Sequence, residues 1–132
     1  MDIPPLLIQS ALSLLAIFAL FIVARGLKLG GKPRLSDASA ARNAAEEVVD
    51  GFAATRVSID RSGTAALARN EDGHIMIIKR HGNRFAGRVL SDAARVREEV
   101  DGLVVDVGET QFGAVRLSLE DPGYWADAIN RL

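Results

Sequence analysis

The stretch Leu6–Arg34, LLIQSALSLLAIFALFIVARGLKLGGKPR, decides how the whole chain is organised. No charged residue occurs between Ile3 and Ala24, and the polar residues there are few: Gln9, Ser10 and Ser13. As an α-helix, residues 5–24 span about 30 Å, which is the thickness of the hydrocarbon core of a bilayer. The sequence therefore predicts a transmembrane helix over residues 5–24.

Two other interpretations of this stretch fit less well. A core helix of a soluble protein carries a polar stripe with a period of 3.6 residues, and no such stripe follows Ser13. A cleaved export signal begins with basic residues, has a shorter apolar run and ends at small residues. Here the chain begins MDIPP, and the apolar run leads directly into Arg25.

The charges that flank the predicted span indicate its orientation. Asp2 is the sole charged side chain before it, whereas four basic residues follow it: Arg25, Lys28, Lys32 and Arg34. Basic residues are retained on the cytoplasmic side of a membrane. We therefore expect a short exterior N-terminus (residues 1–4), a basic juxtamembrane hinge (residues 25–35), and a domain on the cytoplasmic side of a bacterial inner membrane.

Length and composition leave room for one small domain after the span. The chain has 132 residues, of which 48% are apolar and 25% charged, and its net charge is −1. This balance gives no global basic field, so nucleic acid is not an expected partner. The chain has no cysteine, which excludes disulfides, thiolate metal sites and cysteine nucleophiles.

A first helix is expected over residues 36–51. Ser36 or Asp37 can cap its start and Gly51 can end it. Its composition favours helix but is weakly amphipathic, so we interpret it as a spacer helix that lies against the domain. Its expected inner face is short: Ala41, Ala45, Val48 and Val49, with Phe52 as a following anchor.

Residues 52–132 predict a β-rich domain, because the apolar period changes there from 3.6 to 2. About seven strands are expected, in TRVSIDR, TAALAR, HIMIIKR, RFAGRVL, RVREEV, LVVDV and AVRLSLE. In the first of them Val57 and Ile59 should point inward, and Ser58 and Asp60 outward. A final helix should begin with Asp121 as its cap and should dock an apolar face that includes Trp125, Ala128, Ile129 and Leu132.

The expected fold class is an N-terminal transmembrane helix plus a small α+β domain. In that domain about seven antiparallel strands form two packed sheets, with a C-terminal capping helix. The order of elements resembles the pleckstrin-homology-like architecture, and an unclassified small α+β sandwich is the alternative. The stretches EDGHIMIIKRHGNRFAGRVL and GETQFGAVRL resemble a group of uncharacterised, short, single-pass membrane proteins of alphaproteobacteria. That resemblance implies no activity.

One local cluster of basic residues could carry a function. In KRHGNRFAGR the basic side chains are Lys79, Arg80, His81, Arg84 and Arg88, with no acid between Gly73 and Ser91. From Ser36 onward the chain holds 16 acids and 12 bases, so this cluster stands out from its surroundings. It could contact lipid phosphates or an acidic partner surface. The alternative is that charged edge residues block aggregation between strands.

No constellation in the sequence predicts catalysis, a cofactor or a metal. On one strand His74 and His81 would stand about 23 Å apart, so they cannot share a ligand. Glu98 and Glu99 should point to opposite faces of a strand. In GETQFG the side chain of Phe112 either projects as a contact or, as we expect, folds back under its own loop. Stacking aromatics for nucleic acid are absent from the basic cluster apart from Phe85.

The sequence therefore predicts a single-pass membrane protein that presents a small cytoplasmic interaction domain. Its partner would be a protein, which makes it an accessory or adaptor of a membrane complex. The alternative is a module that binds the anionic lipid surface of the membrane to which it is tethered. An enzyme would require a site assembled from residues far apart in the sequence.

Overall fold

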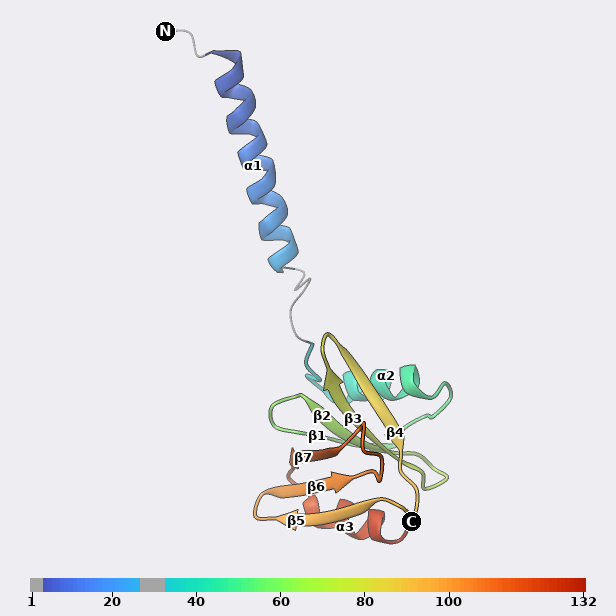
Figure 1. Cartoon of the computed structure of the whole chain (residues 1–132). Coiled ribbons are helices and arrows are strands. Elements are labelled where there is room, and N and C mark those ends of the chain that lie inside the picture. The colour runs from blue at the N-terminus through green and yellow to red at the C-terminus, as the bar shows by residue number, and fades with distance from the viewer. Residues whose placement is uncertain (1–3, 27–32) are drawn as a thin grey trace. The chain divides into compact units, whose positions relative to one another are not determined.

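The computed structural model describes residues 4–26 and 33–132 (Figure 1). The chain divides into two compact units, residues 1–31 and residues 32–132. The first is the helix α1 (Pro5–Gly26). The second is a domain whose elements follow the expected order of one helix, seven strands and a last helix.

Helix α1 is long and apolar enough to cross a membrane, by length and composition. None of its Pro5–Ile22 window is buried by protein, and large side chains such as Leu6 and Leu20 are exposed. The hydroxyls of Ser10 and Ser13 donate to the carbonyls of Leu6 and Gln9, so both are satisfied within the helix. The helix expected over residues 5–24 is therefore present and ends at Gly26.

The structure describes both ends of the basic hinge expected over residues 25–35. Arg25 belongs to α1, and Pro33–Leu35 belong to the domain, because the Leu35 N–H donates to the Gly63 carbonyl at 2.8 Å. Leu35 is also buried. Lys28 and Lys32 lie outside the described residues.

Helix α2 (Ala38–Val48) begins where Asp37 caps it, with the Asp37 carboxylate accepting from the Ala40 N–H at 2.8 Å. Its buried face consists of Ala41, Ala44 and Ala45. Val49 was expected on this face, but it ends the helix with extended backbone and is exposed. Because α2 covers one face of the first sheet, it lies against the domain, and its buried alanines belong to the core.

The first sheet is an antiparallel meander of four strands in the order β1-β2-β3-β4. The strands are β1 (Arg56–Ile59), β2 (Ala65–Arg69), β3 (Ile75–His81) and β4 (Arg84–Val89). Both of its faces are buried in the middle. Ala68, Met76 and Ile78 face α2, while Leu67 and Ile77 face the second sheet. This two-sided burial explains why β2 and β3 are almost continuously apolar.

The second sheet has three antiparallel strands in the order β5-β6-β7, which are β5 (Arg95–Glu99), β6 (Gly102–Asp106) and β7 (Ala114–Ser118). Its inner face contributes Leu103, Val105 and Leu117 to the core shared with the first sheet. Gly102 pairs with Ser118 at a close crossing. A Cβ atom there would overlap the Leu117 carbonyl oxygen, so only glycine fits.

Helix α3 (Pro122–Asn130) closes the core with Trp125 and Ile129, which are buried between the two sheets. Asp121 precedes the helix as expected, but its carboxylate makes no cap bond. It contacts Arg56 and Ser58 of β1 instead. The two antiparallel sheets and the closing C-terminal helix confirm the coarse fold that the sequence predicted.

Candidate functional site

The strand register divides the predicted basic cluster between two faces of the β3–β4 hairpin. His81 pairs with Arg84, and Lys79 pairs with Ala86, whereas Arg80 pairs with Phe85. Side chains alternate along a strand, so Arg80 points to the α2 side. The other four basic residues share the opposite face: Lys79, His81, Arg84 and Arg88. The five basic residues thus lie on one hairpin, but Arg80 is on the other face from the remaining four.

Lys79 and Arg88 contact the loop between β6 and β7 and hold it in place. The Lys79 ammonium donates to the Phe112 carbonyl and lies 4.3 Å from the centroid of the Phe112 ring. The Arg88 guanidinium lies 5.0 Å from that centroid and pairs with Glu109 at 2.7 Å. Phe112 is 5% exposed, which confirms that it folds back under its own loop. These two cations therefore have structural partners.

Arg80 and Arg34 hold the start of the domain. The Arg80 guanidinium donates to the Pro33 carbonyl at 3.3 Å, and its backbone N–H donates to the Thr64 carbonyl. The Arg34 Nε donates to the Ser62 carbonyl at 3.1 Å. The first described residues of the domain are thus bound to the turn between β1 and β2 and to the β3–β4 hairpin (Figure 1).

These contacts bring three segments together at one end of the first sheet, which we call the entry end. They are residues 33–35, the β1–β2 turn (residues 60–64) and the β3–β4 tip (residues 81–84). Its exposed basic side chains are Arg34, Arg61 and Arg84, with His81 beside them. Within the described residues, no ion pair involves Arg61 or Arg84.

The opposite end of the first sheet carries charges of both signs. In an antiparallel meander the β2–β3 turn lies away from the other two turns. That turn exposes Glu71 and Asp72. Arg56 and Arg69 lie at the same end, where β1 begins and β2 ends, and Arg69 is half-buried.

Asp60 is a buried carboxylate that the sequence suggested would point to solvent. It is 9% exposed. It accepts hydrogen bonds from the backbone N–H of Ser118 on β7 and from the N–H and hydroxyl of Ser62. Burial raises the pKa of Asp60, but these bonds and one from Thr64 outweigh it, so its pKa lies below the ordinary value. Asp60 joins the entry end to the second sheet.

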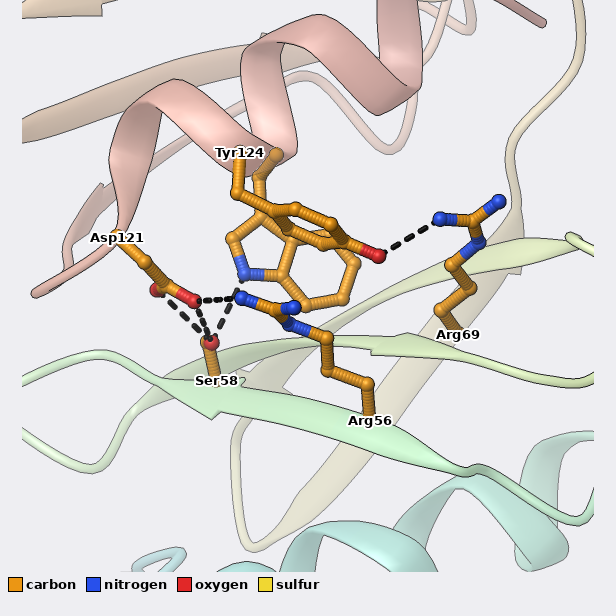
Figure 2. A network of polar contacts seen from close by, with 6 residues as sticks. Arg56, Ser58, Arg69, Asp121 and Tyr124 are labelled. Carbon is orange, nitrogen blue, oxygen red and sulfur yellow. Dashed lines mark hydrogen bonds and ion pairs between the residues drawn. The ribbon is translucent and has the colours of Figure 1, made fainter.

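A polar network links α3 to β1 and β2 (Figure 2). The Ser58 hydroxyl contacts both Asp121 oxygens at 3.0 and 3.1 Å and accepts from the Trp125 indole N–H at 2.8 Å. Arg56 pairs with Asp121 at 3.0 Å, and its guanidinium lies 3.4 Å from the Tyr124 ring centroid. The Tyr124 hydroxyl bonds to Arg69 at 2.7 Å.

The contacts of this network hold α3 against β1 and β2. A serine nucleophile needs a general base that can take its proton, and Asp121 is already paired with Arg56. Neither His74 nor His81 takes part in the network. Among residues 4–26 and 33–132, no group of three or more His, Asp or Glu side chains could hold a metal. The network therefore positions α3.

The β1 residues of this network could have been identified from the sequence. Arg56 and Ser58 alternate with the inward residues of β1, which marks them as facing away from α2. What the alternation cannot reveal is that α3 covers this second face. The Asp121 contact therefore needed the three-dimensional structure.

The described grooves are shallow and lie at the surface. One of them borders the entry end and is lined by Pro33, Glu47, Val48, Asn83, Arg84 and Phe85. It places Arg84 of the tip beside the first described residues of the domain. We therefore take the entry end as the candidate functional site. No protein-family model, curated protein or solved structure matches this chain.

Proposed function

We propose that this is a single-pass inner-membrane protein that presents a small cytoplasmic interaction domain. It would act as an accessory or adaptor of a membrane complex, with its N-terminus outside. The apolar helix α1 supports the anchor. The orientation is supported by the basic residues that follow the span and by the single acid before it.

The domain is best described as pleckstrin-homology-like. Four antiparallel strands, then three, then a helix that plugs the core are the order of elements on which this part of the proposal depends. The proposal includes no catalytic residue, cofactor or metal.

The entry end is the contact surface in this proposal, and the single observation that carries it is the exposure of Arg61 and Arg84 there without ion pairs among the described residues. Elsewhere on the domain, five arginines are paired with acids: Arg56, Arg88, Arg97, Arg116 and Arg131. Arg42 on α2 and Arg95 on β5 are also exposed without an ion pair among the described residues, but Arg61 and Arg84 lie at the same end of the first sheet. Cations without such partners are available to an acidic surface. The candidate partner is an acidic protein, and anionic lipid is the second candidate because the entry end is where the chain comes from the anchor.

Reversing the charge of Arg84 should weaken partner capture. A photoreactive residue at Asn83 in the full-length protein should form a discrete protein adduct in cell membranes. Arg84→Glu should lower its yield about tenfold, equivalent to ~1.4 kcal/mol. Arg131→Glu on α3 makes the same charge change away from the entry end and should leave the yield unchanged. Equal yields in both variants would contradict the proposed surface.

Arg88 is not a suitable test residue, although it belongs to the predicted cluster. Its reversal would break the Glu109 ion pair and the contact with the Phe112 ring. Loss of capture in such a variant would report a displaced loop as readily as a lost contact.

A further inference from the structure

We infer that the entry end binds the phosphates of anionic phospholipid headgroups and so holds the domain against the membrane that anchors it. This inference rests on the proposed function, because it uses the same anchor and the same surface, but it assigns that surface to the second candidate, anionic lipid, in place of an acidic protein. Its first support is the charge pattern. Arg34, Arg61 and Arg84 come from three different segments and converge on one end of the sheet.

The second support is the covalent connection to the anchor. Pro33 follows Gly26, the last residue of α1, by seven positions. A chain extends by at most about 3.3–3.6 Å per residue, so these positions can bridge roughly 25 Å at most. In the sequence, the anchor is therefore followed closely by Pro33 at the basic end of the domain, and the acidic turn with Glu71 and Asp72 is at the other end of the first sheet.

The third support is the composition of the turns at the entry end, which favours a lipid surface over a protein partner. Protein interfaces are dominated by a few buried aromatic or apolar anchors. The β1–β2 turn and the β3–β4 tip consist of DRSGT and HGNR and offer no apolar anchor. Dispersed arginines suit a diffuse anionic surface. Near such a surface each basic residue contributes about 1 kcal/mol to the free energy of binding, or roughly fivefold in affinity.

Exposed acids also lie at this end, but they are fewer than the exposed arginines. Asp60 is buried and accepts hydrogen bonds from Ser62 and Ser118. Glu47 of α2 lines the groove beside Arg84, and Glu120 lines a groove with Arg61. A headgroup would have to tolerate both of these exposed carboxylates.

The experiment uses the full chain, reconstituted in lipid nanodiscs. Because the natural sequence has no cysteine, a single Asn83→Cys substitution places one fluorescent label at the entry end. Asp72→Cys places the matched label at the acidic turn. A quencher attached to lipid headgroups then reports contact with the membrane surface, in discs of phosphatidylcholine alone or with phosphatidylglycerol.

Phosphatidylglycerol should raise quenching at position 83 several-fold and leave position 72 unchanged. High salt should reverse the rise. The double variant Arg61→Glu, Arg84→Glu should abolish the rise in quenching. The double variant Arg61→Lys, Arg84→Lys should keep most of the rise, and Arg131→Glu should keep all of it. Near-ultraviolet circular dichroism of Trp125, the single tryptophan, checks that each variant is folded.

Two other results would overturn the lipid inference, either alone or together with the proposed function. If quenching at position 83 ignores phosphatidylglycerol while the Asn83 adduct to a protein still depends on Arg84, the lipid inference is wrong and the proposed function stands. If neither the quenching nor a protein adduct depends on Arg84, both fail.

Discussion

Trp125→Ala should lower the free energy of unfolding of the domain by about 3–5 kcal/mol, the usual effect of removing a large aromatic side chain from a core. Trp125 is fully buried between the two sheets. Its loss leaves a cavity and removes the indole N–H that binds Ser58. Urea unfolding of the full chain in mild detergent, followed by far-ultraviolet circular dichroism, measures the change.

Trp125→Phe is the matched control. It keeps most of the apolar volume and loses the hydrogen bond to Ser58, so it should destabilise the domain by a smaller amount, about 1–2 kcal/mol. If alanine were no more destabilising than phenylalanine, α3 would not close the core in solution as it does in the structure.

Asp60→Ala should destabilise the domain by about 2–4 kcal/mol. The substitution leaves the Ser118 and Ser62 N–H groups without their acceptor in a largely buried site, and breaking such a network falls in this range. Asp60→Asn keeps an acceptor oxygen and should have a smaller effect. Unchanged stability in Asp60→Ala would mean that this carboxylate does not join the two sheets.

The same carboxylate gives a pH dependence whose sign follows from its lowered pKa. Its pKa is lower in the folded domain than in the unfolded chain. Its contribution is therefore fully present above the unfolded pKa, near 4, and is lost as pH falls through the folded pKa. Urea unfolding at pH 7 and pH 3 should show that the stability gap between the natural protein and Asp60→Asn narrows at pH 3. A gap that widened would contradict the assignment.

Local patterns predicted much of the fold. The uninterrupted apolar run predicted α1, and the change of period predicted seven strands close to their observed bounds, because turns such as NEDG and HGN stand between them. Asp37 could be identified as a cap from its position before an alanine-rich stretch. These features depend on neighbours in the sequence, which is why the sequence could show them.

Features that depend on distant segments could not be predicted in this way. Alternation along β1 showed that Ser58 and Asp60 face away from α2, but not that α3 and β7 cover that side. The basic cluster looked uniform, yet Lys79 and Arg88 bind a loop about thirty and twenty residues further on. Arg61 was not part of the predicted site, because its turn joins the entry end through Gly63 and Leu35.

Membrane topology is the measurement that tests the central claim most directly. A single cysteine at position 72 of the full-length protein, expressed in a Gram-negative bacterium, should not react with a membrane-impermeant maleimide in intact spheroplasts. It should react once the inner membrane is disrupted. Labelling in intact spheroplasts would place the domain outside the cell membrane and would contradict the cytoplasmic orientation on which the proposed function depends. Recovery of the protein in the soluble fraction would contradict the anchor itself.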